Sequence, residues 1–388
     1  MRIIVVALVV FYGVACGRAE VEQALCESEN IKIKTNFAGA GLHRCEWLQQ
    51  GYFKLYLKPE NTPINNSPWY AFQVQSQTAT KVAFELHIES GTPRYQPKIS
   101  RNRQDWQAID FAIDSSKNTL RFSADIAQGE SWFAGQELIT ASDYQAWTKG
   151  LSKRYPFVEK LVGKSENGRD LQALILEQPS SSEWLLIIGR QHPPEVTGAI
   201  ALMSFVEALL HNFPAFLQRF NLMLVPNLNP DGVALGYWRH NTNGVDLNRD
   251  WKQRTQAATR LMHKEIQSLY ARGGHLVFAL DFHSTYRDIF YTMPAGYGIV
   301  PQDFSRKWLE SLAQAHPEYE LRQKPGHNPD KGVFKQYIAD TYGVHGVTYE
   351  VGDNTERKVI HKIAQSAAKR LQQQLMNTSQ PAFIPMQR

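Results

Sequence analysis

The sequence lacks a clustered run of basic residues, although its 388 residues carry a formal net charge of +5. Lysine and arginine are scattered among aspartate and glutamate, whereas a nucleic-acid partner requires a basic patch with aromatic residues between the charges. We therefore expect no nucleic-acid binding. Internal repeats and low-complexity segments are also lacking. The 43% of hydrophobic and 20% of charged residues are typical of a globular protein, and the length allows two domains.

Cysteine is scarce, with 3 residues in the whole chain. If Cys16 is removed or lipidated during export, Cys26 and Cys45 remain as a pair. In an exported protein such a pair predicts a disulfide, which would stabilise the start of the first domain by roughly 3 kcal/mol. Two free buried thiols are the alternative if the compartment is not oxidising.

Long apolar runs are absent except near the amino terminus, so no segment after this run is expected to span a bilayer. The run at 3–15 is shorter than the roughly 20 residues of a membrane-spanning helix. It predicts a secretory signal over residues 1–19, and hence an exported protein that is periplasmic, membrane-anchored or secreted. Gly13 and Ala15 precede Cys16 as in a bacterial lipoprotein signal, although Gly13 stands where leucine is usual. A lipid anchor at Cys16 would be the only membrane contact, and plain secretion is the alternative.

The periodicity of the next segment is typical of short strands. Within residues 20–140, apolar and polar side chains alternate at 31–34, 52–57 and 81–88, and turn-forming residues separate these stretches. Several short strands at this spacing predict a small antiparallel β-sandwich domain.

Residues 141–378 follow a different pattern. Nearly continuous apolar strands, such as 184–189 and 275–282, alternate with amphipathic helices, such as 197–211. Because strands of this kind are buried on both faces, the pattern predicts an α/β domain whose sheet is flanked by helices on both sides. Residues 379–388 are expected to form a loose tail.

Candidate metal ligands follow two of these strands. His192 and Glu195 lie in the turn after strand 184–189, where open α/β sheets place their ligands. His283 ends another apolar strand, so it can approach the same edge of the sheet. Two histidines and one carboxylate form the three-ligand set of a catalytic zinc, with the fourth position left for water. A single histidine in such a turn is more often a core or capping residue, so the prediction depends on the combination.

Further motifs follow in a specific order. They are His192, Glu195, Asn229-Pro230-Asp231-Gly232, Arg239, Asp246-Leu247-Asn248-Arg249, His283 and Glu350. This order resembles the zinc carboxypeptidase family of the carboxypeptidase A type, and the strands around Trp69 and Trp106 are similar to its cytosolic-carboxypeptidase branch. The resemblance implies a mixed β-sheet, one Zn²⁺ per chain and hydrolysis of the last peptide bond of a peptide with a free carboxyl terminus. It implies nothing about the oligomeric state.

The resemblance also implies two catalytic roles. Glu350 would be the general base that takes a proton from water and passes it to the leaving amine. The alternative interpretation is that Glu350 is an ordinary exposed glutamate of a strand. Its apolar neighbours indicate instead that it is buried, and burying a carboxylate that has no function is energetically costly. Arg239 would stabilise the oxyanion, with a surface arginine as the alternative. Asp281 and Asp288, which flank His283, are expected to be structural.

The resemblance also implies that Asn248 and Arg249 bind the substrate. Asn248 and Arg249 would bind the terminal carboxylate of the substrate, because a guanidinium forms two parallel hydrogen bonds to a carboxylate. Asp246 would bind the far ring nitrogen of His192 and fix its tautomer, a role compatible with that of a turn-forming aspartate.

The preference for the terminal residue depends on one lysine. In this family a residue about fifteen positions before the general base sets the side-chain pocket, and here that residue is Lys335. A cation there would favour a terminal Glu or Asp, whereas a solvated helix lysine is the alternative. The mobile tyrosine of the digestive enzymes is replaced by Asn328, and neither Tyr337 nor Tyr342 is assigned to its role.

Two other functions stay open. An amidohydrolase that deacylates N-acyl amino acids would use the same metal ligands and the same carboxylate clamp. A binding protein with a peptidase-like shell would be expected to lose a ligand or the base, yet all three ligands and Glu350 are present.

Overall fold

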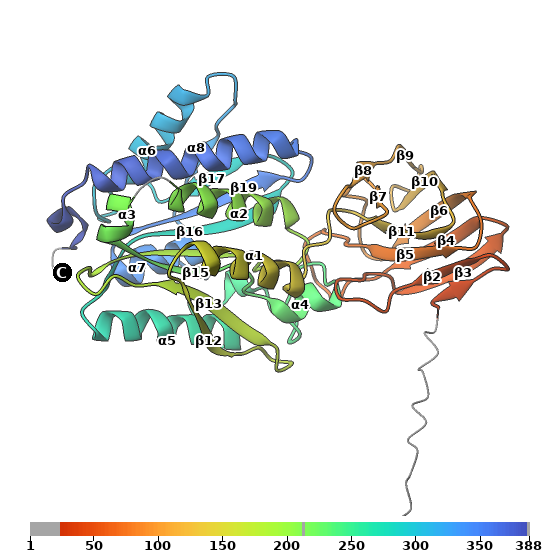
Figure 1. Cartoon of the computed structure of the whole chain (residues 1–388), viewed down its shortest axis with the longest axis horizontal. Coiled ribbons are helices and arrows are strands. Elements are labelled where there is room, and N and C mark those ends of the chain that lie inside the picture. The colour runs from red at the N-terminus through yellow and green to blue at the C-terminus, as the bar shows by residue number, and fades with distance from the viewer. Residues whose placement is uncertain (1–23, 212–213, 386–388) are drawn as a thin grey trace, which may run out of the picture.

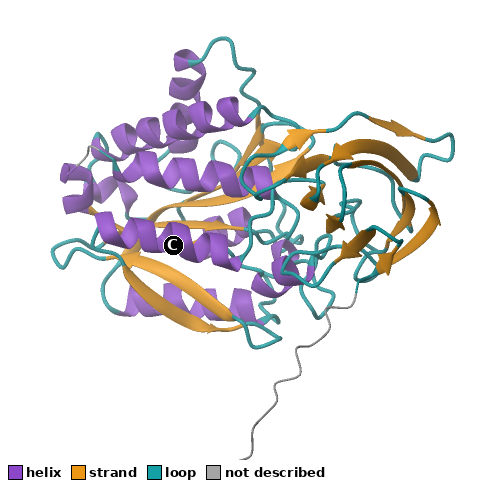
Figure 2. Cartoon of the chain, turned by 45° about the vertical axis from the view of Figure 1, so that its right-hand side comes forward, coloured by secondary structure: helices purple, strands orange, loops and turns teal. Residues whose placement is uncertain are grey.

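The computed structural model describes residues 24–211 and 214–385, so the predicted signal at 1–19 and the anchor at Cys16 lie outside the described residues (Figure 1). Within this part, no helix is both long enough and apolar enough to cross a membrane. A β-sandwich (described residues 24–140) lies beside an α/β domain (described residues from 141 onward). Figure 2 shows the helices gathered in the α/β domain, whereas the described sandwich is built of strands.

Two sheets form the sandwich. The first has the order β1-β2-β5-β11-β7-β8 and is antiparallel throughout. Its strands are β1 (Cys26–Glu27), β2 (Ile31–Lys34), β5 (Ala71–Ser76), β11 (Gly129–Ala134), β7 (Lys98–Ser100) and β8 (Gln107–Ala108). The second has the order β3-β4-β6-β10-β9. Its strands are β3 (Arg44–Gln49), β4 (Tyr52–Leu57), β6 (Thr80–Ile88), β10 (Thr119–Ile126) and β9 (Phe111–Ile113).

One strand pair departs from the predicted antiparallel arrangement. β4 and β6 pair in parallel, because the chain leaves the second sheet after β4, forms β5 in the first sheet and then returns. The other pairs of the sandwich are antiparallel, as expected. Between the sheets, Phe84 of the second sheet contacts Phe72 and Phe133 of the first, each at a ring distance of 5.1 Å. The alternating apolar side chains of the sequence therefore make the core of the sandwich.

The two cysteines of the sandwich are paired. Cys26 in β1 and Cys45 in β3 form a disulfide with a Cα–Cα distance of 5.7 Å. The predicted disulfide is confirmed, and the alternative of two free thiols is wrong. Since β1 and β3 belong to different sheets, the bond joins the two layers.

The α/β domain contains one mixed sheet of eight strands in the order β12-β13-β15-β14-β16-β19-β17-β18. The strands are β12 (Val158–Lys164), β13 (Asp170–Leu176), β15 (Phe220–Val225), β14 (Glu183–Gly189), β16 (His275–Thr285), β19 (His345–Gly352), β17 (Ile289–Thr292) and β18 (Gln323–Pro325). The four central strands, β15, β14, β16 and β19, are parallel to one another, and β13 and β17 flank them in the antiparallel sense.

Helices cover both faces of this sheet, as predicted (Figure 1). On one face lie α1 (Ala141–Arg154), α2 (Val196–Leu210), α3 (Pro214–Arg219), α6 (Phe304–Ala315) and α8 (Arg357–Met376). On the other lie α5 (Ala257–Ala271) and α7 (Phe334–Tyr342). Within β14, Leu185 and Ile187 pack against the first group, and Leu186 and Ile188 pack against the second. Every residue of β14 is buried, which explains the unbroken apolar run from Trp184 to Ile188.

The carboxyl-terminal segment differs from the predicted loose tail. Gln380–Phe383 form a 3-10 helix, and the Phe383 side chain is fully buried with its ring 5.7 Å from that of Phe304. The predicted loose tail is therefore wrong for the part up to residue 385, which Phe383 anchors, and residues 386–388 lie outside the described residues.

The start of α2 packs closely on β16, and Gly198 makes this possible. A Cβ atom at Gly198 would lie 2.5 Å from the backbone oxygen of His283. We expect Gly198→Ala to destabilise the protein by about 1–3 kcal/mol, because the helix must shift away from the strand. Gly150→Ala in α1, where a Cβ would meet nothing within 4 Å, is the matched control and should be neutral or stabilising. Urea denaturation measures both, and equal effects would contradict the packing argument.

Candidate active site

Three neighbouring parallel strands bring the predicted site residues together. His192 and Glu195 lie between the end of β14 and the start of α2. His283 lies near the end of β16, directly opposite Glu350 of β19 in the strand register. Because β14, β16 and β19 run in the same direction, their carboxyl ends meet at one edge of the sheet.

The three predicted metal ligands meet at this edge. One oxygen of Glu195 lies 2.8 Å from Nδ1 of His192, and its other oxygen lies 2.7 Å from Nδ1 of His283. One ligand atom from each residue lies within 4.8 Å of the others, and all three residues are buried. Two imidazole nitrogens and one carboxylate are the donors that Zn²⁺ takes in catalytic sites, so the residues fit this ion.

The charges of the cluster are strongly coupled. Burial alone would raise the pKa of Glu195, but His192 and His283 outweigh it and hold this pKa well below its usual range. Burial likewise opposes a charged His283, yet the carboxylates of Asp281 and Glu195 raise its pKa well above the ordinary value. A buried position surrounded in this way by carboxylates favours a cation.

Each ligand histidine has a carboxylate at its far ring nitrogen. Nε2 of His192 lies 2.8 Å from Asp246, as predicted. Nε2 of His283 lies 2.7 Å from Asp281, a contact that the sequence analysis did not foresee. The spacing of Asp281 and His283 could have indicated this contact, because residues two positions apart on a strand face the same side of the sheet. Asp288 has the expected structural role and accepts a hydrogen bond from the amide of Gly352 at 2.6 Å.

The turn that carries His192 is held by its own neighbours. Arg190, with a φ of 53°, donates from Nε and one terminal nitrogen to the carbonyl oxygen of Pro193 at 3.1 and 2.7 Å. Gln191 donates to Asp281 at 2.7 Å and accepts from the indole of Trp251 at 2.9 Å. Neither residue was predicted. Arg190 ties the turn to itself, and Gln191 connects it to Asp281, the aspartate behind His283.

A cavity of about 430 Å³ opens in front of the cluster. It is lined by Asn65, Asn66, Arg94, His192, Glu195, Arg239, Asn248, Arg249, Ser284, Thr285, Tyr286 and Glu350. The predicted base, oxyanion arginine and carboxylate clamp therefore share one pocket with two of the metal ligands.

Glu350 has the properties of a general base. Burial raises its pKa to about 7, with His283 acting in the opposite direction. Its Oε2 is a buried atom without a hydrogen-bond partner among the described residues. A free carboxylate oxygen with a pKa near neutrality, at the wall of the pocket, is suited to exchange a proton with water or substrate.

The comparison with known proteins agrees with this geometry. The sequence profile of the zinc carboxypeptidase family matches residues 144–378, more than half of the chain. The chain belongs to the zinc carboxypeptidase family. Mouse cytosolic carboxypeptidase 6 is 26% identical over 311 residues, which cover 71% of this chain and 56% of the mouse protein. Cytosolic carboxypeptidase 2 of Xenopus tropicalis is 31% identical over 317 residues, which cover 70% of this chain and 32% of that protein.

A solved structure supports the fold. The metallo-carboxypeptidase from Burkholderia cenocepacia superposes with a TM-score of 0.76 at 16% identity, covering 90% of this chain and 100% of that chain. The predicted family and fold class are thus confirmed, and the family consists of zinc-dependent hydrolases. This chain spans only about half, or less, of the length of the two cytosolic relatives.

In this member of the zinc carboxypeptidase family, Arg239 and the predicted carboxylate clamp are positioned by the residues around them. Nε of Arg239 donates to Asp246 at 2.8 Å, which leaves the terminal amino groups for a substrate oxygen. The side-chain oxygen of Asn248 accepts from the amide of Phe334 at 2.9 Å. Arg249 is exposed and donates to the carbonyl oxygen of Asn248 at 2.7 Å. Of this pair, Arg249 is the freer to meet a substrate carboxylate.

Lys335 is buried, which contradicts the alternative of a solvated helix lysine. It is 4% exposed, and its Nζ contacts the carbonyl oxygen of Gly326 and, at 3.6 Å, the sulfur of Met293. Burial lowers its pKa to about 8. Lys335 is not among the residues that line the cavity around Glu350, but it follows Phe334 in sequence, and the Phe334 amide donates to Asn248 of that cavity.

No tyrosine named in the sequence analysis reaches the pocket. Tyr337 and Tyr342 are buried in the core beneath α7, with their hydroxyl groups 2.8 Å apart. Asn328 donates its backbone amide to Gln336. The aromatic residue at the pocket is Tyr286, which follows β16 and is 75% exposed.

The sandwich also contributes to the pocket, which the sequence analysis missed. Arg94 donates from Nε to Asp353 at 2.8 Å and from a terminal nitrogen to the carbonyl oxygen of Ser284 at 3.2 Å. Asn65 and Asn66 line the same wall. No local motif marks these residues, because each is brought to the pocket by the contact between domains.

Asp246 contacts both the predicted metal ligand His192 and the predicted oxyanion residue Arg239, so its charge is expected to matter for both residues. We expect Asp246→Asn to weaken Zn²⁺ binding about 10- to 100-fold, because the neutral amide supports the ring of His192 less well. Competition with a fluorescent chelator measures this. Asp170→Asn, which removes an exposed ion pair with Lys164, is the control and should bind Zn²⁺ normally. Unchanged affinity in Asp246→Asn would show that this contact does not tune the site.

Proposed function

We propose that the protein hydrolyses the carboxyl-terminal peptide bond of peptides with a free carboxyl terminus. The observation that carries this proposal is the convergence of His192, Glu195 and His283 beside a pocket that contains Glu350, Arg239 and Arg249. The first three would hold the metal, and the last three are suited to proton transfer, oxyanion binding and carboxylate binding.

Zinc would supply one part of the chemistry. When bound by His192, His283 and Glu195, Zn²⁺ lowers the pKa of water and polarises a carbonyl group. Asp246 and Asp281 would hold the two rings in the tautomer that turns Nδ1 toward the ion.

The chain itself would supply the remaining groups. Glu350 accepts a proton from the attacking water and returns it to the leaving amine, which its pKa of about 7 allows at neutral pH. The terminal amino groups of Arg239 stabilise the oxyanion. Arg249, aligned by Asn248, binds the terminal carboxylate of the substrate and so restricts cleavage to the last peptide bond.

A preference for an acidic terminal residue is the finer part of the proposal. Buried charges are normally paired, yet the contacts of Lys335 among the described residues are a carbonyl oxygen and a thioether. A terminal Glu or Asp side chain would provide the missing carboxylate. The sequence position of Lys335 supports this, since it follows Phe334, whose amide binds Asn248 of the proposed carboxylate clamp.

We also propose that the protein is exported. The amino-terminal run is typical of a secretory signal, and the disulfide between Cys26 and Cys45 supports an oxidising compartment. Intact-mass measurement of protein extracted from the native membrane would detect an acyl modification at Cys16. A soluble protein that lacks the signal would instead indicate plain secretion, and cytoplasmic protein with the signal retained would contradict export.

Replacing the general base tests the proposed reaction. We expect Glu350→Gln to bind Zn²⁺ normally and to lower kcat about a hundredfold or more, because the amide cannot accept the proton. Turnover of a blocked dipeptide and metal analysis measure the two effects. Glu318→Gln, which removes an exposed partner of Lys362, is the control and should retain full activity. Native turnover by Glu350→Gln would show that another group is the base.

Replacing Lys335 tests the preference for acidic residues. We expect Lys335→Met to lower kcat/KM about tenfold for a Glu-terminated peptide relative to a Leu-terminated one, because the cation is lost while the volume is kept. In the native enzyme the same preference should decline above about pH 8, where Lys335 loses its proton. A Lys335→Asp variant should instead favour basic terminal residues. If neither variant changes the preference for the terminal residue of the substrate, Lys335 does not set that preference.

A further inference from the structure

A glutamate of the sandwich holds the segment that carries the catalytic arginine. The Glu60 carboxylate accepts hydrogen bonds from three consecutive backbone amides of the α/β domain. One oxygen accepts from Trp238 at 2.8 Å, and the other accepts from Arg239 at 2.8 Å and from His240 at 2.7 Å. A carboxylate bound to three amide groups fixes both the position and the orientation of that backbone.

Two further contacts with the sandwich fix the same segment. The indole of Trp238 is 2% exposed and belongs to the core of the sandwich, together with Ile88. The neighbour of Glu60, Asn61, lies with its side-chain oxygen 2.8 Å from Nδ1 of His240. Residues on either side of Arg239 are therefore anchored in the other domain.

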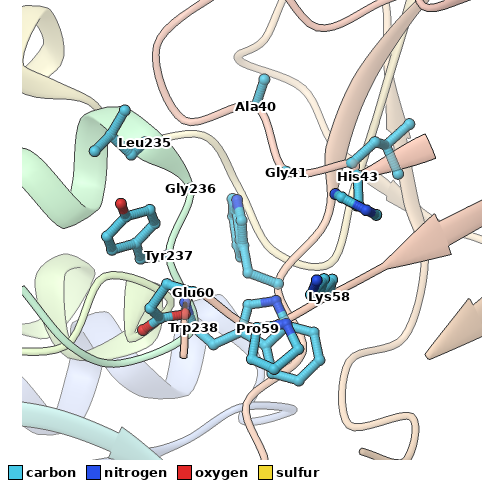
Figure 3. A pocket seen from close by; sticks show the side chains of 12 residues that line it. Ala40, Gly41, His43, Lys58, Pro59, Glu60, Leu235, Gly236, Tyr237 and Trp238 are labelled. Carbon is cyan, nitrogen blue, oxygen red and sulfur yellow. Dashed lines mark hydrogen bonds between the residues drawn. The ribbon is translucent and has the colours of Figure 1, made fainter. Parts of the chain in front are cut away.

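The packing on one side of this segment is incomplete. Figure 3 shows Glu60 beside Trp238 at the wall of a cavity of about 230 Å³, lined by the sandwich on one side and by residues 235–238 on the other. Because side chains do not fill this space, the hydrogen bonds to Glu60 add to the packing of Trp238 in holding the backbone there.

The side chain of Arg239 is held at its other end by the metal site. Its Nε donates to one oxygen of Asp246, and the other oxygen of Asp246 lies 2.8 Å from Nε2 of His192. The guanidinium thus spans the distance between a backbone fixed by Glu60 and a carboxylate fixed by a metal ligand. A shift of that backbone would move the terminal amino groups away from the substrate oxygen or break the contact with Asp246.

Glu60 is not needed merely to attach one domain to the other. Arg94 is paired with Asp353 at 2.8 Å, and Arg357 is paired with Glu137 at 2.7 Å, and both pairs cross the domain boundary elsewhere. The carboxylate of Glu60 is directed instead at the three amides that include that of Arg239.

We propose that Glu60 is a positioning residue for Arg239, so that the sandwich forms a working part of the catalytic apparatus. The inference rests on the proposed function of Arg239 in oxyanion binding. Because the oxyanion exists only in the transition state, loss of this positioning lowers kcat and leaves KM nearly unchanged.

The test is a double-mutant cycle between Glu60 and Arg239. Glu60→Gln replaces one acceptor oxygen by a donor, and we expect it to lower kcat at least tenfold with KM within twofold and Zn²⁺ content unchanged. In an Arg239→Ala background, the same substitution should change kcat less than twofold, since there is no guanidinium left to position. Glu85→Gln is the matched control in the same sandwich, where the carboxylate pairs with Lys54 and Arg121, and it should retain native kcat.

Hydrogen exchange separates this inference from the proposed function. The amides of residues 238–240 should exchange at least tenfold faster in Glu60→Gln, whether or not the protein is a peptidase. Glu60→Asp keeps the charge but shortens the reach, and serves as the second variant if Glu60→Gln does not fold. Native kcat in either folded variant, or an equally large loss in the Arg239→Ala background, would overturn the proposal. Absence of peptidase activity in the native protein, with exchange as expected, would refute the proposed function alone.

Discussion

The Glu195 carboxylate contacts both ligand imidazoles at once, and this double contact constrains three elements of the α/β domain. It requires the turn after β14, the start of α2 and the end of β16 to meet within a few ångströms. The backbone satisfies this because Gly198 lets α2 approach the carbonyl oxygen of His283. Ser284 reinforces the contact, since its hydroxyl accepts from the amide of Gly198 at 2.8 Å. The metal site is thus built from backbone packing before any ion is considered.

Much of the α/β domain was predictable because its strands and helices are marked by patterns of apolar residues that are local in the sequence. The strand predicted at 184–189 is observed at Glu183–Gly189, and the helix predicted at 197–211 is observed at Val196–Leu210. The sandwich was predicted in outline, but the parallel pairing of β4 with β6 depends on a crossover that alternation of apolar residues does not reveal. The edge strand β12 was missed, since exposed residues interrupt its apolar pattern.

The active site was predictable as far as its chemistry lies in short motifs. His192, Glu195, Asp246 and Glu350 belong to such motifs. His192, Glu195 and Glu350 line the pocket, and Asp246 contacts the far ring nitrogen of His192. By contrast, Glu60 contacts Arg239 across 179 positions of sequence, and Arg94 contacts Asp353 across 259. Such contacts depend on how two domains dock. Their residues carry no local pattern that would distinguish them from any other surface glutamate or arginine.

The indole of Trp238 belongs by sequence to one domain and by packing to the core of the other. If the sandwich were exchanged for an unrelated domain, the Trp238 indole of the α/β domain would be left exposed. The isolated sandwich would in turn have a cavity in its core where this indole packs. The two halves are accordingly expected to melt in a single cooperative transition. Chimaeras joined at the boundary near residue 140 are expected to fold poorly, because an unrelated partner would not bury this indole.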